Sequence, residues 1–272
     1  MDYNKIVALV YEARKIVFSK SKLAQVQNKN PYDFVTQVDT GISDFLKTEL
    51  FKAFPNVGFM TEEESRHSLQ EKCFILDPID GTTNLIYDYK MSSISLAYTE
   101  KGKVVFGVVL NPFTHELFFS LRGNGAYLYK TDRGIKKLLQ TGIENYKANP
   151  LRTSNRVLKS SLIEFGAGSS HKNEAPQTFR LGQRVFENCL DLRRICSTAL
   201  SICYIAAGRL DGYFERVIKP WDYAAAILIL EEAGGLSSTW DGNPLPLDKN
   251  GTIICANAVI YQDLISIINK NS

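Results

Sequence analysis

Apolar side chains recur at helical spacing in two stretches near the start of the chain. Within residues 3–20 one set of apolar positions carries the pattern: Ile6, Leu9, Val10, Ala13 and Val17. A second set lies between Asp39 and Phe54, and the pattern stops at Pro55. Because apolar residues three and four positions apart share one helical face, both stretches predict amphipathic helices. The polar segment QNKNPYDF at 27–34 is expected to be a loop.

The apolar pattern changes to that of strands from Ile94 to Tyr129. Four segments, SISLAYTE, KVVFGVVLN, HELFFSL and GAYLYK, are separated by the turn-like sequences KGK, NPFT and RGNG. This arrangement predicts an antiparallel meander. Two earlier strands are expected, a short one within 57–65 and a buried one that ends at Asp77. The basic segment TDRGIKKLLQTGIENYK after the meander is expected to be a solvated edge.

Helical and strand patterns alternate after about residue 150. Helices are predicted at 177–190, 198–207, 222–233 and 259–268, and strands at 192–196, 210–214 and 252–255. Gly234 follows the third of these helices, where glycine supplies a left-handed cap. A helix pair with a meander, followed by alternating elements, indicates a layered α+β fold. We expect one compact unit made of two halves, residues 1–140 and 141–272.

The composition argues against several classes of protein. A net charge of +3 over 272 residues gives no strong attraction to nucleic acid or to an anionic membrane. The longest apolar run, AAAILIL at 224–230, is too short to span a bilayer, and the first 15 residues do not resemble a signal peptide. The five cysteines are scattered, mostly within apolar runs, which predicts reduced, buried thiols in a cytoplasmic protein and no zinc site.

Acidic side chains stand where four apolar segments end: Asp39, Glu63 with Glu64, the pair Asp77 and Asp80, and Asp222. Each has a structural explanation of its own, as a helix N-cap, a turn or a solvated charge run. Together they could converge on one point, where carboxylates raise one another's pKa unless a cation neutralises them. Magnesium is the matching cation, because it takes oxygen ligands and bridges to phosphate.

The second acid of ILDPIDGTTN is followed by a potential phosphate cradle. Gly81 lets the backbone approach a ligand closely. The next residues, Thr82 to Asn84, could open a short helix whose free N–H groups bind phosphate. An ordinary capped helix start is the alternative, but it does not account for Asp77 and Asp80 beside it.

Four ordered motifs resemble the inositol monophosphatase family of magnesium-dependent, lithium-sensitive phosphatases. They are VTQVD with Asp39, the acidic EES at 63–65, DPIDGTTN at 77–84 and WDYAA at 221–225. The resemblance covers nearly the whole chain. It implies a layered αβαβα sandwich of the sugar-phosphatase type, two or three Mg²⁺ ions per site and a homodimer.

The resemblance also assigns roles to residues of this chain. One metal would be held by Glu63, Asp77 and the carbonyl of Ile79, a second by Asp77, Asp80 and Asp222, and a third, weaker one near Glu63. Glu63 and Thr82 would orient the attacking water, with Asp39 steering Thr82. The N–H groups of Gly81 and Thr82 would hold the phosphate. Substrate contacts are expected from a further set: Asp80, Glu215, Thr198 and Lys219.

Several positions depart from the family pattern. Glu62 stands where glycine usually precedes the paired glutamates, and we expect it to face solvent. Cys196 stands where the family has glycine, and a small buried residue is its structural interpretation. Lys219 falls where vertebrate-type enzymes have histidine, so it could contact a second anionic group or face water. Lys29 resembles a loop lysine that reaches toward the metals. Arg66 and Arg194 are further candidates for a second anion.

These departures affect the leaving group more than the reaction. The leading hypothesis is hydrolysis of inositol monophosphate by a metal-activated water. A phosphatase of broader specificity is the alternative, acting also on the 2′-phosphate of NADP, fructose 1,6-bisphosphate or 3′-phosphoadenosine 5′-phosphate. A metal-dependent binding or regulatory protein without turnover is the hypothesis from another class. No role is expected for Asp88 beyond the surface.

Overall fold

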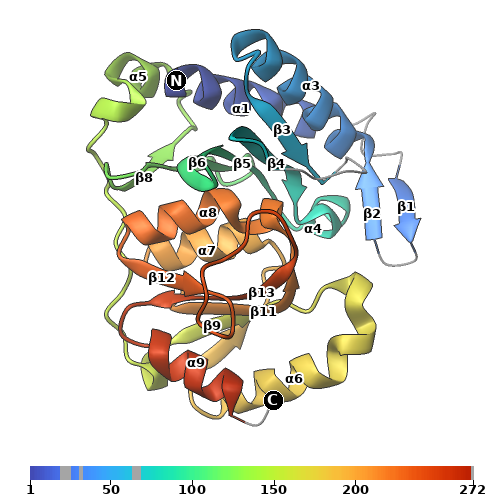
Figure 1. The fold of residues 1–272 in the computed structure, drawn as a ribbon, viewed down its shortest axis with the longest axis vertical. Coiled ribbons are helices and arrows are strands. Elements are labelled where there is room, and N and C mark those ends of the chain that lie inside the picture. The colour runs from blue at the N-terminus through green and yellow to red at the C-terminus, as the bar shows by residue number, and fades with distance from the viewer. Residues whose placement is uncertain (19–25, 31–32, 63–68, 271–272) are drawn as a thin grey trace.

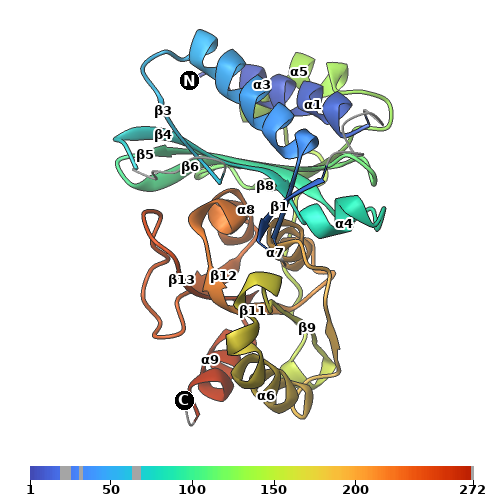
Figure 2. The ribbon, with the colours of Figure 1, turned by 90° about the vertical axis from the view of Figure 1, so that its right-hand side faces the viewer.

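Helices and sheets alternate in five layers (Figures 1 and 2). The computed structural model describes residues 1–18, 26–30, 33–62 and 69–270. The outer helices on one side are α1 (Tyr3–Val17) and α3 (Gln37–Ala53), and those on the other side are α6 (Ala175–Phe186) and α9 (Tyr261–Asn269). Between the two sheets lie α7 (Thr198–Ala206) and α8 (Pro220–Glu232). The layered αβαβα prediction is therefore confirmed.

The first sheet contains six strands in the order β3-β4-β5-β6-β7-β8. Their bounds are β3 Gly58–Thr61, β4 Lys72–Asp80, β5 Ser93–Glu100, β6 Lys103–Asn111, β7 Glu116–Leu121 and β8 Ala126–Lys130. β3 pairs parallel to β4, and every later neighbour pairs antiparallel. The meander predicted from alternating apolar segments is confirmed. The short helix α4 (Thr82–Ile86) connects β4 to β5.

The second sheet contains five strands in the order β10-β9-β11-β13-β12. Their bounds are β9 Leu162–Phe165, β10 Asp191–Arg193, β11 Gly212–Ile218, β12 Gly235–Ser238 and β13 Gly251–Asn257. β10, β9 and β11 run parallel, whereas β13 pairs antiparallel with both β11 and β12. The patterns after residue 150 predicted β10, β11 and β13 to within a few residues but left out β9 and β12.

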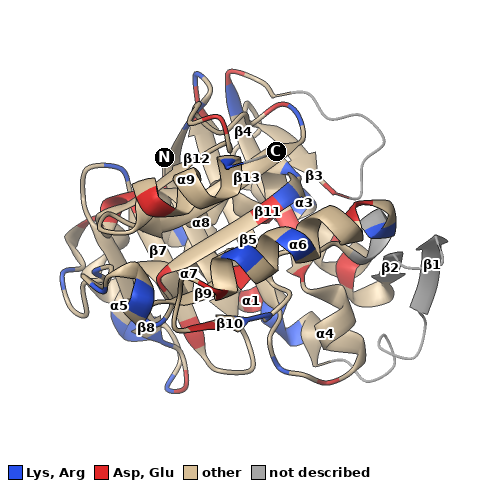
Figure 3. Cartoon of the chain, turned by 90° about the horizontal axis from the view of Figure 1, so that it is seen from below, with Lys and Arg blue, Asp and Glu red and all other residues tan. Residues whose placement is uncertain are grey.

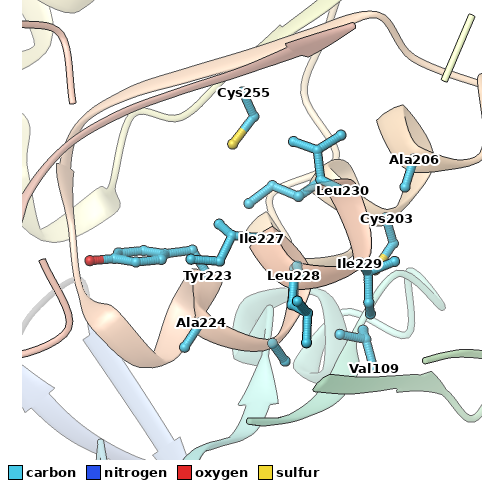
Figure 4. Close-up of a cluster of buried hydrophobic side chains, with 14 of the residues drawn as sticks. Val109, Cys203, Ala206, Tyr223, Ala224, Ile227, Leu228, Ile229, Leu230 and Cys255 are labelled. Carbon is cyan, nitrogen blue, oxygen red and sulfur yellow. The ribbon is translucent and has the colours of Figure 1, made fainter. Parts of the chain in front are cut away.

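Helix α8 is buried on nearly all sides because it lies between the two sheets. Figure 4 shows its side chains Ile227, Leu228 and Leu230 among those of neighbouring elements, including Val109 of β6. A helix that is apolar all round is expected to lie in the core. At Gly107 of β6, an added Cβ would lie 2.4 Å from the Ala225 carbonyl oxygen. The helix therefore rests directly on the backbone of the sheet at this point.

Two segments differ from their prediction. The supposed loop at 27–34 contains strand β1 (Val26–Asn30) and the start of β2 (Asp33–Thr36), which pair antiparallel. Backbone pairing joins them, and this requires no apolar alternation in the sequence. The basic segment at 131–147 is not simply a solvated edge. It contains α5 (Lys136–Thr141), and Ile135, Leu138 and Ile143 are buried in the cluster that includes α1.

The distribution of charged residues and the lengths of the helices agree with the small net charge and the short apolar runs of the sequence. Basic and acidic segments are interspersed on the side of the molecule shown in Figure 3. Within the described ranges, no helix has both the length and the apolar character needed to cross a membrane.

Candidate active site

Strand β4 carries two carboxylates into the interior. All residues from Cys73 to Asp80 are buried, and Asp77 is only 2% exposed. The pairing with β5 is regular up to Asp77 opposite Ser95 and then shifts before Asp80 opposite Ser93. Such an irregularity redirects side chains at the end of a strand. Asp77 Oδ1 accepts a hydrogen bond of 3.1 Å from the N–H of Ile79, which fixes the Pro78 turn.

The turn after β4 requires a glycine. Gly81 has φ +88° and stands directly before α4. A Cβ there would lie 3.0 Å from the Met91 carbonyl oxygen and 3.2 Å from that of Cys196. Both the backbone conformation and the lack of space exclude a larger residue. The chain therefore brings the Gly81–Thr82 backbone close to the segment at 196, which comes from the other half of the sequence.

Asp39 lies beside Thr82, as predicted. The Thr82 hydroxyl lies 2.9 Å from Asp39 Oδ1 and 3.1 Å from the Ile79 carbonyl oxygen. Asp39 Oδ2 accepts bonds from the N–H and hydroxyl of Thr36, at 2.8 and 2.5 Å. Asp39 is thus the third residue of α3 and closes a capping box with Thr36. Burial raises its pKa, and the bonds from Thr36 and Thr82 oppose that rise.

Asp80 connects the two halves of the molecule. Its carboxylate accepts bonds from the Ser197 hydroxyl at 2.6 Å, the Ala199 N–H at 2.8 Å and the Thr198 N–H at 3.2 Å. These donors belong to the N-terminus of α7, where unpaired N–H groups need acceptors. Asn84 extends the same contact, because its side chain donates to the Ile195 carbonyl oxygen at 2.8 Å.

Asp222 reaches the same region from α8. It is the third residue of that helix, and its Oδ2 accepts a 3.0 Å bond from the N–H of Lys219. The Lys219 ammonium lies 3.3 Å from Glu62 Oε1, across 157 positions of sequence. Glu62, which follows β3, lines the cavity described below. Its expected position in solvent is therefore wrong: only 19% of its side chain is exposed.

The carboxylates act on one another electrostatically. Burial raises the pKa of Asp77 well above its usual range, and the charges of Glu62, Asp80 and Asp222 raise it further. The same two causes, burial and then Glu62, raise the pKa of Asp222. Burial also raises the pKa of Asp80 to about 6, although its bonds from Ser197 and the α7 N-terminus lower it. These acids therefore lie near enough to repel one another in their ionised forms.

The donor chemistry of this cluster fits a hard divalent cation. Carboxylate oxygens are the ligands that Mg²⁺ prefers, and a cation would remove the repulsion that raises these pKa values. Each ionised carboxylate accepts several interactions, so the bonds made by Asp77 and Asp222 leave acceptor capacity for a metal. Within the described part of the chain, no three His, Cys, Asp or Glu side chains form a group that could hold a metal ion. Glu63 does not belong to that described part.

Known proteins are similar to this chain in sequence and fold. The model of the inositol monophosphatase family matches residues 3–272. The inositol-1-monophosphatase of Mesorhizobium japonicum is 33% identical over 260 residues, which are 93% of this chain and 89% of that protein. The Nus factor SuhB of Escherichia coli is 32% identical over 245 residues, 89% and 85% of the two chains. The SuhB crystal structure from Bartonella henselae has a TM-score of 0.84 at 31% identity, covering 99% of both chains.

The chain belongs to the inositol monophosphatase family. It is accordingly a phosphatase, a phosphoric monoester hydrolase that acts on phosphate esters. The recognition made from the four sequence motifs is confirmed.

A cavity of about 310 Å³, lined by Glu62 of the carboxylate cluster, contains several residues expected to contact substrate. Gly81, Thr82, Thr198 and Glu215 all line it, so four residues expected to contact substrate meet there. The Tyr213 hydroxyl donates to Glu215 Oε2 at 2.5 Å and lies 3.0 Å from Thr198 Oγ1. Burial raises the pKa of Glu215 to about 7, and Asp80 adds to the rise.

Glu164 supports the wall of this cavity and was not found from the sequence. It is buried, and its carboxylate accepts bonds from the N–H groups of Ile195 and Cys196 and from the Ser201 hydroxyl. The only signal in the sequence was an acid within the apolar segment LIEF, which was too short to be recognised as β9. Glu164 holds the backbone that precedes α7, and so fixes the neighbours of Asp80.

Cys196 differs from its expected state. It is exposed rather than buried, and its φ of +61° lies in the left-handed region, which favours glycine. Cys189 is partly exposed, whereas Cys73, Cys203 and Cys255 are buried as predicted. None of the five forms a disulfide. This backbone conformation would account for the glycine that the resemblance leads us to expect at position 196, and this chain adopts it with a cysteine.

The remaining candidates are located differently. Arg194 lines the cavity, and its guanidinium lies over the rings of Phe165 and Phe179. Asp88 is exposed and pairs with Lys90, which agrees with a surface position. The predictions for three residues have no structural test, because Glu63 and Arg66 fall outside the described residues and the Lys29 side chain is not described.

Proposed function

We propose that this phosphatase hydrolyses inositol monophosphate to inositol and phosphate with the help of Mg²⁺. The observation that carries the proposal is the meeting of two groups of residues in one place. The Gly81–Thr82 turn, suited to a phosphate, shares a cavity with Glu215 and Thr198, suited to a hydroxylated leaving group. Glu62, whose charge acts on Asp77, Asp80 and Asp222, also lines this cavity.

The metal ligands in the proposal follow the sequence, with one addition. Asp77 would bridge two ions, the Ile79 carbonyl and Glu63 would complete the first, and Asp80 and Asp222 would complete the second. A third, weaker ion would lie near Glu63. Glu62 is added to this set because its charge acts on Asp77, Asp80 and Asp222 alike. When bound, Mg²⁺ supplies positive charge beside the ester and lowers the pKa of water there.

The protein's own residues would then orient the reactants. An ionised Asp39 can only accept hydrogen bonds, so the Thr82 hydroxyl donates to it and keeps its lone pairs for a water molecule. The N–H groups of Gly81 and Thr82 would bind phosphate oxygens. Glu215, held by Tyr213, would accept hydrogen bonds from hydroxyl groups of the leaving alcohol. Glu63 would orient the attacking water together with Thr82.

The assembly and location of the enzyme are part of the same proposal. We propose a homodimer in the cytoplasm, inhibited by lithium, with residues 1–140 and 141–272 forming one catalytic unit. The bonds from the α7 N-terminus to Asp80 support the last point, because they cross from one half to the other.

A broader specificity is the second candidate. A neighbouring cavity of about 480 Å³ shares Gly166 to Gly168, Arg194 and Glu215 with the first. It also contains two more basic side chains, those of Lys172 and Arg216. Arg216 pairs with Glu174 at 2.8 Å, so a second anionic group of the substrate would share or replace that interaction. The candidate leaving groups are those of NADP, fructose 1,6-bisphosphate and 3′-phosphoadenosine 5′-phosphate.

A phosphate-release assay with purified protein separates these possibilities. Inositol 1-phosphate with Mg²⁺ is expected to release phosphate, and chelation with EDTA is expected to abolish release. Faster release from NADP, fructose 1,6-bisphosphate or 3′-phosphoadenosine 5′-phosphate would favour the broader enzyme. Magnesium binding without release from any of these esters would contradict the proposal and favour a binding or regulatory role.

A further inference from the structure

Lys219 is a basic side chain that lies at the carboxylate cluster. Its ammonium group is 3.3 Å from Glu62 Oε1 and 5.5 Å from the centre of the Trp221 ring. The ring is almost fully buried and can attract a cation to its face. Lys219 is the residue before α8, so its stem starts three positions from Asp222. The ammonium is therefore held by the Glu62 carboxylate and the aromatic ring.

This single charge acts on both sides of the site. It pairs directly with Glu62, and it lowers the pKa of Asp222, which burial and Glu62 raise. The ion pair joins the loop after β3 in the first half to the N-terminus of α8 in the second. Because only 30% of the Lys219 side chain and 19% of the Glu62 side chain are exposed, solvent screens the pair only in part.

A divalent cation would need the same oxygen atoms. A carboxylate that accepts from an ammonium group must give up that interaction, or share it, to ligate Mg²⁺. Two positive charges close together also repel each other. Lys219 and a metal ion that uses Glu62 thus oppose each other's binding.

We propose that Lys219 is a built-in counter-ion of the carboxylate cluster, which pairs with Glu62 and competes with Mg²⁺ for it. This positioning role rests on the proposed function, because it requires Mg²⁺ to bind here. It sets the metal affinity of the site from within the chain. The enzyme would therefore bind Mg²⁺ more weakly than the acids alone allow.

The test is a calorimetric titration of the metal-free, full-length protein with magnesium chloride. Lys219→Met removes the charge but keeps an apolar stem of similar length over Trp221. It is expected to bind Mg²⁺ about three- to tenfold more tightly than the wild type, on the scale of removing one partly exposed ion pair. Lys219→Arg keeps the charge and is expected to bind as the wild type does.

Lys52→Met is the matched control, because Lys52 pairs with Glu49 on the exposed face of α3 at 2.8 Å. It removes the same charge and the same kind of ion pair, and it is expected to leave the affinity unchanged. Circular dichroism verifies that each variant is folded. An unchanged or weaker affinity in a folded Lys219→Met would overturn the competition, and so would an equal gain in Lys52→Met. If the wild type binds no Mg²⁺, the proposed function fails together with this inference.

Discussion

The Thr82 hydroxyl lies 2.9 Å from Asp39 Oδ1, so a residue of the first turn of α3 orients the first residue of α4. The direction of this bond follows from chemistry, because an ionised carboxylate cannot donate. Asp39→Asn places an amide of the same shape at this position. Because the Thr36 N–H needs an acceptor, the amide oxygen faces Thr36 and the amide NH₂ faces Thr82. The Thr82 hydroxyl then donates to the Ile79 carbonyl oxygen instead. We expect turnover to fall roughly 100-fold, on the scale of losing one preorganised catalytic contact.

Phosphate release at saturating Mg²⁺ measures this effect. Asp88→Asn is the control, because Asp88 is an exposed acid that pairs with Lys90 at the surface. A folded Asp39→Asn variant with a near-normal rate would show that Thr82 does not depend on Asp39 for its role.

Neutralising an acid of the cluster should lower both turnover and Mg²⁺ affinity, whereas neutralising a surface acid should not. Glu62→Gln and Asp222→Asn each remove one proposed metal ligand while nearly preserving shape. We expect either variant to lower turnover by roughly 100-fold or more, because charge stabilisation in a preorganised site is usually the largest catalytic term. Each should also weaken Mg²⁺ binding in a calorimetric titration.

Glu63→Gln decides which glutamate of the acidic run is indispensable. If Glu63→Gln is inactive and Glu62→Gln is not, the addition of Glu62 to the ligand set is wrong. If neither glutamate matters at saturating Mg²⁺, the assignment of the acidic run to the metal site fails altogether.

Position 196 should favour glycine in stability measurements. Cys196 has φ +61°, and a branched side chain in the left-handed region is strongly disfavoured. We expect Cys196→Val to lower the free energy of unfolding by about 1–2 kcal/mol. Cys196→Gly should raise it by at most about 1 kcal/mol, because the relief of strain is offset by the flexibility that glycine adds to the unfolded chain.

Urea denaturation of the metal-free protein provides these values. Cys189 is a suitable control, since its φ is not positive and its side chain is also partly exposed. Glycine should be the worse choice there. A Cys196→Gly variant less stable than Cys196→Val would contradict the role of backbone strain.

The stability of the metal-free protein should depend on pH through Glu215. Its pKa is raised from 4.5 to about 7 in the folded state, first by burial, so the folded protein binds the proton more tightly than the unfolded chain. The stabilising contribution of the protonated acid is complete below about pH 4.5 and is lost as the pH rises through about 7. The loss should be on the order of 1–3 kcal/mol.

Comparison of the wild type with Glu215→Gln isolates this contribution from that of the other buried acids. The free energy of unfolding, measured with EDTA at several pH values between 4.5 and 8, should fall less steeply in the variant. Parallel curves for the two proteins would mean that Glu215 titrates alike in the folded and unfolded states.

The sequence predicted the site more reliably where the chemistry is local. Asp77, Gly81 and Thr82 were recognised because turn, acid and phosphate-binding backbone are adjacent along the chain. Glu62 was misplaced, because a run of three glutamates contains no signal for which of them turns inward. Glu164 was missed, because its partners at Ile195 and Cys196 are about thirty positions away and become neighbours only in the folded sheet.

The fold shows the same division between local and distant information. Helices α3 and α8 carry their own periodicity or apolar run and their own end signals, so they were predicted to within a few residues. β1 and β2 depend on pairing with each other, and their composition is polar for most of its length. In α5, Leu138 stands among lysines and is buried because distant elements, including α1, pack in the same cluster.

The contact between Gly107 and α8 determines how closely this helix approaches the first sheet. Ala225 lies one helical turn after Asp222, and its carbonyl oxygen would be only 2.4 Å from a side-chain carbon at position 107. A single methyl group in the middle of β6 would therefore lift the helix and carry Asp222 away from the acids of β4. The separation between Asp222 and the acids of β4 therefore depends on the close approach of α8 to a residue without a side chain. Gly107, which takes no part in the reaction, would in this way control the distance between the carboxylates of the active site.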